Sequence, residues 1–209
     1  IALLIIYIIL FEGLPPFWFE YTWYTCCFRS STNGGGSFNS EVEVVNEWFV
    51  DRWNPGIDVA GTGTGADLHY SYSQAGFLSL WEASAWFRNI SDPFFSPSVS
   101  DEVYVADGYT YAGNTQSASD GNPHISVTDD FSASDYDIYY TRSTDGGSSF
   151  LDPIAVDVGY YDTYEARMAM DLADNPFLAW TDERDGHYSI YCAWSEDGGE
   201  TIRPDHHKV

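Results

Sequence analysis

The chain has 209 residues, 44% of them hydrophobic and 18% aromatic, which is enough apolar material for a sizeable core. Against 32 acidic residues stand only eight lysines and arginines, so the formal net charge is −24 at pH 7. This excess argues against binding to a nucleic-acid backbone or to an anionic membrane surface, and it suits a secreted or cell-surface protein that stays soluble through charge repulsion.

Residues 1–11 are almost wholly apolar and admit two interpretations. They could belong to a secretion signal, although no basic segment precedes them and no clean small-residue cleavage site follows. They are too short to span a bilayer. Alignment of residues 8–11 with residues 168–171 of a later repeat favours the second interpretation, a buried inner strand.

A phrase of eight residues, which starts with serine and contains adjacent glycines, occurs three times. It reads STNGGGSF at 31–38, STDGGSSF at 143–150 and SEDGGETI at 195–202. A single Asp-Gly-Gly would be an ordinary hairpin turn. Three copies with the same serine and the same terminal apolar position indicate an internal repeat.

The chemistry of the phrase is structural. Its glycines accept a positive φ in a tight turn, while the Asp or Asn side chain and the Ser hydroxyl can accept hydrogen bonds from backbone N–H groups of the turn. The terminal Phe or Ile is expected to tuck under the turn as an anchor. The residues with these structural roles are Ser31, Asn33, Gly35, Phe38, Ser143, Asp145, Gly147, Phe150, Ser195, Asp197, Gly199 and Ile202.

Similarity extends beyond the phrase and indicates units of about 50 residues. Asn122 corresponds to Asn175 and Asp129 to Asp182, and a degraded copy of the phrase at 73–77 suggests a further unit. We therefore expect one domain over 1–209 with units at 1–38, 39–77, 78–150 and 151–209, the third of which holds an insertion at 78–97.

The last unit predicts the order of strands within a repeat. We expect an inner strand at 167–171, a second strand at 176–181, a loop at 182–187, a third strand at 188–194 and an outer strand after the phrase. Strand-forming residues dominate the whole chain and no long stretch has helical periodicity, so the sequence predicts an all-β fold.

The pattern Ser-x-Asp-x-Gly-x-x-aromatic, which follows Ile138-Tyr139 and Ile190-Tyr191, resembles the Asp-box of the sialidase-like (bacterial neuraminidase repeat) β-propellers. The resemblance covers nearly the whole chain and is weakest at 39–119. It implies a β-propeller of four-stranded antiparallel blades with Asp-box turns, about four of which are present. Because such propellers usually have more blades, we expect an incomplete ring or one part of an assembled ring rather than an autonomous four-bladed ring.

In that family the Asp-box joins the third and fourth strands of a blade, on the face opposite the ligand site. Its members include sialidases and other glycosidases, lectins, sorting receptors and assembly factors. The resemblance therefore specifies the type of blade better than it specifies an activity.

Alternating strand direction places the loop at 182–187 on the face opposite the phrase. Carboxylates, arginines and tyrosines gather on that face, which is typical of a sugar site, although loop ends in so acidic a chain would be acidic in any case. The candidate ligand-binding residues are Asp51, Arg52, Asp129, Asp130, Tyr164, Glu165, Arg167, Asp182, Glu183 and Arg184.

Sialidase chemistry, as the resemblance implies it, needs three arginines on the substrate carboxylate, a Tyr nucleophile activated by a Glu, and an Asp as acid and base. Arg29 and Arg142 precede copies of the phrase and would lie on the wrong face. Tyr164 and Glu165 are neighbours, and neighbours on a strand point to opposite faces. The sequence therefore assigns no catalytic residue.

We predict no cofactor and no metal site. No Cys/His spacing fits a metal, and although the negative charge could recruit Ca²⁺, no run matches an EF-hand loop. The odd number of cysteines argues against a complete disulfide framework. Cys26, Cys27 and Cys192 are interpreted as small core residues, with a bridge from Cys192 to either of the other two left open.

Three hypotheses for the function follow. The first is a secreted, non-catalytic module that binds a glycan or an extracellular protein, or serves as a scaffold. The second is an exo-glycosidase of sialidase type, and the third is a structural repeat of a larger surface assembly. We expect no nucleic-acid partner and no membrane span under any of them.

Overall fold

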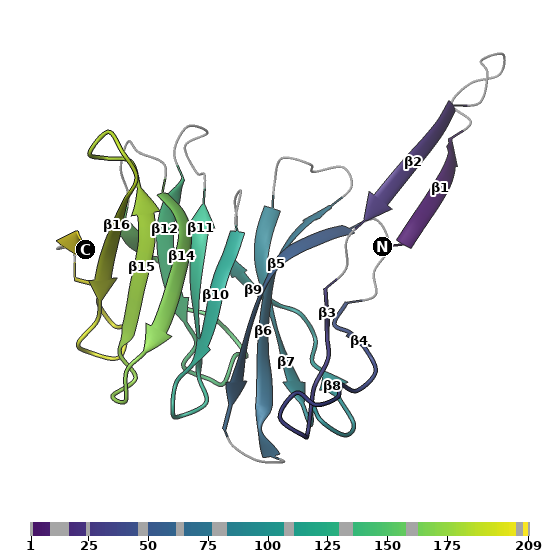
Figure 1. The fold of residues 1–209 in the computed structure, drawn as a ribbon, viewed down its shortest axis with the longest axis horizontal. Coiled ribbons are helices and arrows are strands. Elements are labelled where there is room, and N and C mark those ends of the chain that lie inside the picture. Colours follow the sequence, from purple (N-terminus) through teal and green to yellow (C-terminus); the bar gives the residue numbers. More distant parts are fainter. Residues whose placement is uncertain are drawn as a thin grey trace.

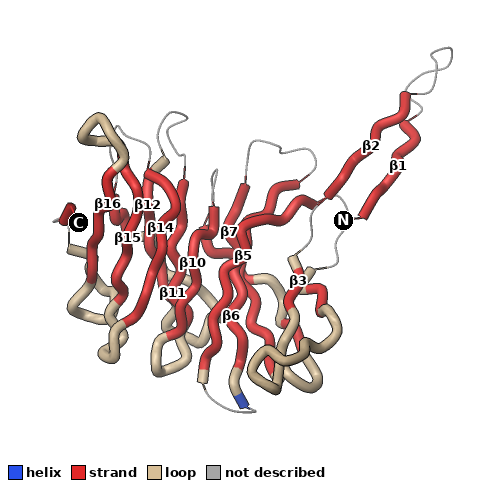
Figure 2. Tube along the Cα trace, in the orientation of Figure 1, coloured by secondary structure: helices blue, strands red, loops and turns tan. Residues whose placement is uncertain are grey.

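The computed structural model of the protein describes residues 2–8, 17–23, 26–45, 50–61, 65–76, 83–106, 111–129, 136–157, 163–203 and 207–208. The elements in these ranges are β-strands, and the described part of the chain contains no α-helix, as the sequence predicts. The sheets stand side by side (Figure 1), and Figure 2 shows the connecting turns at their two ends. No helix long and apolar enough to cross a bilayer occurs in the described part of the chain.

Two small antiparallel sheets come first. One pairs β1 (Ala2–Ile8) with β2 (Phe17–Trp23), and the other pairs β3 (Cys27–Phe28) with β4 (Val42–Glu43). Residues 2–8 thus form a strand, whereas residues 9–16 lie outside the described ranges, so the predicted inner strand at 8–11 is not tested beyond Ile8. Figure 1 shows the β1–β2 hairpin extending away from the other sheets.

Three larger antiparallel sheets follow. The first contains β5 (Val50–Ala60), β6 (Asp67–Gly76) and β7 (Ala83–Ser91), with β8 (Ser98–Val99) and β9 (Val103–Ala106) both paired to β7. The second runs in the order β10 (Tyr111–Ser117), β11 (Pro123–Asp129), β12 (Asp137–Arg142) and β13 (Ile154–Asp157). The third runs β14 (Thr163–Met170), β15 (Pro176–Asp182), β16 (Ser189–Trp194) and β17 (His207–Lys208).

Burial shows how these sheets pack face to face. Every residue of β11 is buried, because the β10–β13 sheet has a neighbour on both faces. Along β15 buried and exposed residues alternate instead. Only one face of the β14–β17 sheet is covered by the described residues, and it packs against the β10–β13 sheet.

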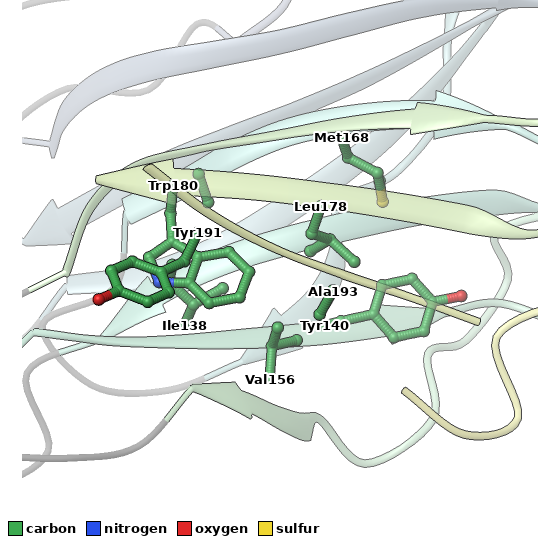
Figure 3. Packing of buried hydrophobic residues seen from close by; sticks show 9 residues of the cluster. Ile138, Tyr140, Val156, Met168, Leu178, Trp180, Tyr191 and Ala193 are labelled. Atoms are coloured by element: carbon green, nitrogen blue, oxygen red, sulfur yellow. The ribbon is translucent and has the colours of Figure 1, made fainter. Parts of the chain in front are cut away.

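The core is divided into three layers, each between two neighbouring sheets. In the layer of Figure 3, Ile138 and Tyr140 of one sheet meet Leu178 and Trp180 of the next. The second layer contains Phe87, Val105, Ile125 and Val127, and the third contains Cys26, Phe28, Tyr70 and Tyr72. Burial raises the pKa of the Cys26 thiol, in keeping with a role as a small core residue.

The three copies of the phrase form turns with one pattern of hydrogen bonds. Ser143 Oγ accepts from the backbone N of Gly147 (2.8 Å), and Asp145 Oδ1 accepts from the backbone N of Ser149 (2.9 Å). The same two bonds recur from Ser195 and Asp197 at 2.8 and 2.9 Å, and from Ser31 and Asn33 at 2.9 and 2.9 Å. We call these three turns, residues 31–38, 143–150 and 195–202, the repeat turns.

The repeat turns at 143–150 and 195–202 each also bond to the turn between the first two strands of their sheet. Asn122 Oδ1 accepts from the backbone N of Gly146 (2.8 Å), and Asn175 Oδ1 accepts from the backbone N of Gly198 (2.9 Å). This explains why the two asparagines correspond in the sequence. The terminal anchors differ: Phe150 and Ile202 pack on the core, but Phe38 is 61% exposed.

The sheets correct two expectations about residues 73–97. Residues 73–76 lie inside β6 and form no turn, and residues 83–91, placed by the sequence in an insertion, are β7. The sheets thus run 50–106, 111–157 and 163–208, and not along the predicted unit boundaries.

His124 gives the fold a dependence on pH. It is buried, its Nδ1 lies 2.5 Å from the Tyr140 hydroxyl, and burial together with the charge of Arg142 lowers its pKa to about 4. As pH falls below about 6.5, this histidine becomes protonated in the unfolded chain, whereas in the folded chain it stays neutral until pH approaches 4. Stability should therefore drop by up to about 3 kcal/mol between pH 6.5 and 4.

We expect His124→Gln, which keeps a donor and an acceptor, to show a smaller drop over this interval. Urea denaturation of both proteins at pH 7 and pH 4.5 measures the difference. The exposed His187 provides the control, because His187→Gln should keep the full drop. Equal drops in wild type and His124→Gln would show that His124 does not cause the effect.

Candidate functional site

The ends of the sheets opposite the repeat turns carry the predicted site. Asp182 ends β15, Asp157 ends β13 and Asp129 ends β11, and the loop 182–187 joins β15 to β16 at the same end. We call this end, with the loop 182–187, the loop-end face. In Figure 1 it lies at the top, and the repeat turns lie at the bottom.

Arg184 joins two sheets on this face. Its Nε donates to Asp182 Oδ2 (2.8 Å), and its Nη2 donates to Asp182 and to Asp157 of the preceding sheet. The backbone N of Arg184 also donates to Asp182 Oδ1 (2.6 Å), so the loop folds back on the strand that it leaves. The guanidinium therefore bridges two buried carboxylates from different sheets.

Two aromatic side chains complete this cluster. Trp180 Nε1 donates to Asp157 Oδ2 (2.9 Å), and the guanidinium carbon of Arg184 lies 4.2 Å from the ring centroid of Tyr191. The Tyr191 hydroxyl donates to Asp185 Oδ2 (2.7 Å). The loop 182–187 is thus fixed through Arg184 to Asp182 and through Asp185 to Tyr191.

The contacts of the cluster shift the pKa values of Asp182, Arg184 and Tyr191 in the direction that keeps each in its ordinary charge state. Burial acts to raise the pKa of Asp182, but the hydrogen bonds and charge of Arg184 outweigh it and hold that pKa below its usual value. The hydrogen bond to Asp182 raises the pKa of Arg184, and the hydrogen bond to Asp185 raises the pKa of Tyr191. A carboxylate held ionised in this way can accept hydrogen bonds but is a poor general acid.

Asp129 and Arg52 lie in two other spaces between sheets. Asp129 is only 1% exposed and faces the sheet that contains β9. Arg52 is buried at the start of β5, near enough to Cys26 for its charge to act on the pKa of that thiol. Arg52, Asp129 and Asp182 therefore share the loop-end face but occupy three successive layers.

Arg167 lies apart from Asp182 and Arg184. It pairs with Ala179 across β14–β15, which places it on the opposite face of the sheet from Asp182. Its side chain is exposed, and its Nη1 donates to the carbonyl of Ala166. The register shifts between Tyr164 and Arg167, which the sequence pattern does not reveal.

The structure describes the side chain of only one of the remaining predicted site residues, Glu183. Glu183 is exposed in the loop, and its carbonyl accepts from the backbone N of Gly186 (2.8 Å). Asp51 lies in β5, and Tyr164 and Glu165 lie in β14, but their side chains are outside the described part of the chain. Asp130 is outside the described residues altogether.

Tyr72 and Glu102 come nearest to the tyrosine and glutamate pair of sialidase chemistry. The Tyr72 hydroxyl donates to Glu102 Oε1 (2.6 Å), and Arg88 lies 3.2 Å from the same oxygen. However, Tyr72 is fully buried, and burial together with the hydrogen bond to Glu102 raises its pKa. This pair therefore joins β6 to the segment before β9 and offers no nucleophile to a substrate.

Sequence reasoning missed three residues of the loop-end face: Asp157, Trp180 and Tyr188. Asp157 belongs to an outer strand of another sheet, and only the paired strands show that it faces Asp182 through Arg184. Tyr188 is 63% exposed directly after the loop, where an aromatic ring can stack on a ligand. Its place beside a charged loop was the signal available in the sequence.

Metal binding has no support from the described side chains. Among them, no three His, Cys, Asp or Glu residues lie close enough together to hold an ion.

Comparison with known proteins finds the fold but no family. No family model and no curated protein matches the chain. An α-L-arabinofuranosidase from Fusarium graminearum in complex with an iminosugar inhibitor matches with a TM-score of 0.65 at 13% identity, over 88% of this chain and 58% of that one. A PL25 ulvan lyase matches with a TM-score of 0.62 at 15% identity, over 88% of this chain and 50% of that one.

An α-L-arabinanase from Penicillium chrysogenum complexed with arabinobiose matches with a TM-score of 0.59 at 13% identity, over 92% of this chain and 62% of that one. The chain thus spans between half and about three fifths of the length of these three proteins. Likeness at such identities is a likeness of fold. Together with the described sheets it shows that the chain has a β-propeller fold, as predicted.

Proposed function

We propose that this protein is a secreted propeller of the sialidase-like type that binds a glycan with its loop-end face and does not cleave it. The observation that carries the proposal is the exposed Tyr188 beside the anchored loop 182–187. An exposed aromatic ring next to fixed carboxylates and an arginine offers both a stacking surface and hydrogen-bond partners to a sugar. The repeat turns, at the other end of the sheets, support assignment to the sialidase-like type.

Two further observations support glycan binding without catalysis. Proteins that share the fold are carbohydrate-active enzymes, two of them described with sugar-like or sugar ligands. Against catalysis, Asp157 and Asp182 are both engaged by Arg184, and Tyr72 is buried. Because one guanidinium holds both carboxylates, they are not arranged as the separate acid and base or nucleophile that glycoside hydrolysis usually needs.

A glycoside hydrolase or polysaccharide lyase is the second candidate. It is favoured by the fact that the three similar solved structures are enzymes of these kinds. Their greater length would leave room for catalytic groups outside the part that this chain matches.

A glycan-array screen of the full chain, followed by hydrolysis assays on arabinan, ulvan and a fluorogenic sialoside, separates the candidates. Binding without turnover supports the proposal, whereas turnover of any of these substrates replaces it with the enzyme. Absence of both binding and turnover would contradict it and leave the structural role in a surface assembly.

Tyr188→Ala should weaken binding of the best array glycan by about two- to tenfold, because stacking on an aromatic ring contributes about 0.5–1.5 kcal/mol. Phe38 is the matched control, since it is equally exposed but lies in a repeat turn at the other end of the sheets. Isothermal titration of both variants measures the effect. A loss in Phe38→Ala and none in Tyr188→Ala would place the glycan on the wrong face for this proposal.

A further inference from the structure

A cavity of about 240 Å³ lies outside the cluster around Arg184. It opens between β9 of the 50–106 sheet and the β10–β13 sheet, one layer away from that cluster. Its walls are mainly apolar and aromatic, and they include Val105, Val127, Phe150, Tyr104 and Tyr139. The buried carboxylate of Asp129 also lines it.

The internal repeat shows why space remains here. Val127 lies two residues before Asp129, as Trp180 lies two residues before Asp182 in the next sheet. Each pairs with a tyrosine of the following strand, Val127 with Tyr139 and Trp180 with Tyr191. Trp180 is 2% exposed and fills the equivalent space between its sheet and the preceding one. Valine is much smaller than tryptophan, so the space beside Val127 is not filled.

The outer strands complete the correspondence. Asp157 pairs with Ile138 at a register shift in β13, and Ala106 pairs with Ala85 at the same kind of shift in β9. Asp157 accepts a hydrogen bond from Trp180 Nε1, whereas Ala106 offers no side-chain acceptor. In the layer that holds the cavity, Val127 and Ala106 thus stand in place of the Trp180–Asp157 pair. The aspartate at the strand end, Asp129, is present in this layer as Asp182 is in the other.

The lining indicates the chemistry of an occupant. The equivalent space is filled by a flat ring that has apolar faces and one hydrogen-bond donor, the indole of Trp180. A sugar ring shares this character, because its C–H faces pack on tyrosines and its hydroxyls donate to carboxylates. Asp129 and Asp152 both line the cavity, and with a chain charge of −24 they oppose an anionic ligand.

Size and access narrow the choice further. The volume of about 240 Å³ is below the range of about 300–1,000 Å³ that is usual for drug-sized ligands, so it suits one ring rather than a chain of rings. Leu151, Asp152 and Pro153 line the cavity and are exposed, which gives the ligand a way in from solvent.

We propose that this cavity between β9 and the β10–β13 sheet binds a single neutral sugar ring, as a second site separate from the cluster around Arg184 and the loop 182–187. The proposal does not depend on glycan binding by the loop 182–187. A terminal sugar of a branched glycan and a free monosaccharide would present the same chemistry to it.

NMR titration of the full chain with D-galactose, D-glucose and L-arabinose tests the proposal, with D-glucuronate as the acidic counter-probe and indole as the aromatic one. We expect at least one neutral sugar to bind with a Kd on the order of 1 mM, as suits so small a ligand. Its shifts should map to Val105, Val127 and Tyr139 and not to the loop 182–187. Shifts confined to that loop would support sugar binding by the loop and overturn the cavity site.

The variant Val127→Trp/Ala106→Asp copies the pair that fills the next layer. It should fold, and it should weaken binding of that sugar at least tenfold by occupying the cavity. If the double variant does not fold, Val127→Phe serves the same purpose with a smaller ring. Undiminished binding in a folded variant, equal binding of glucuronate, or binding of indole alone would each overturn the proposal.

Discussion

Gly199→Ala is expected to destabilise the protein by about 3–4 kcal/mol. Gly199 has φ +81°, and a Cβ there would lie 1.9 Å from the Tyr140 hydroxyl and 2.8 Å from its Cζ. Tyr140 cannot move aside easily, because it is fully buried and its hydroxyl contacts His124. The change therefore combines backbone strain of about 1–2 kcal/mol with overpacking of about 1–3 kcal/mol.

The internal repeat supplies a second glycine in the same position, Gly147, and the neighbouring Gly198 serves as a control. Gly147 has φ +88°, and its Cβ would meet Phe87 Cε1 at 2.5 Å, so Gly147→Ala should cost a similar amount. Gly198, with φ +68° and nothing within 4 Å, tests backbone strain alone, and Gly198→Ala should cost about 1 kcal/mol. Urea denaturation measures all three. Equal losses at Gly198 and Gly199 would show that the sheets do not pack here as described.

Arg184→Ala should destabilise the protein by about 3 kcal/mol, the second of the two largest effects. It leaves Asp157 and Asp182 buried, close together and without their shared cation. Removing one partner of a buried ion pair costs about 3–5 kcal/mol, and the lower end applies because the Arg184 side chain is 27% exposed. Thermal and urea unfolding at pH 7 measure the loss.

The pH dependence of this loss tests its cause. In the wild type the folded pKa of Asp182 is lowered, so its contribution is present above the unfolded value of about 3.9 and disappears as pH falls through the folded value. In Arg184→Ala burial would raise that pKa, and protonation would relieve the strain as pH falls toward 4. The gap between the two proteins should therefore narrow on acidification.

Arg203 is the control for Arg184. It lies at the repeat-turn end of the same sheet, pairs with the exposed Glu196, and has its guanidinium carbon 5.9 Å from the ring centroid of Trp194. Exposed pairs contribute little, so Arg203→Ala should change stability by less than about 1 kcal/mol at any pH. A loss as large as that of Arg184→Ala would contradict the role given to burial.

The sequence could predict the last two sheets because their turns have a specific chemistry. Ser143 and Ser195 begin turns whose hydrogen bonds fix the third and fourth strands, and Asn122 and Asn175 mark the turns that they contact. The 50–106 sheet has no such phrase. Its corresponding turn at 92–97 contains two prolines and two phenylalanines, and Asp92 adopts φ +47° there, so nothing in the repeat pattern identifies it.

The site was less predictable than the fold, for two physical reasons. Arg184 has one partner nearby in the sequence, Asp182, and another on a different sheet, Asp157, and only packing brings the second one close. The face on which Arg167 lies depends on a register shift, and one shifted residue moves a side chain to the other face of a sheet.

Hydrogen–deuterium exchange of the full chain, with and without the best glycan from the array, tests most directly where the ligand binds. If the loop-end face is the glycan site, peptides that cover residues 182–190 should gain protection on binding, while the repeat turns at 143–150 and 195–202 should exchange as before. Protection of the repeat turns without protection of residues 182–190 would contradict the central claim.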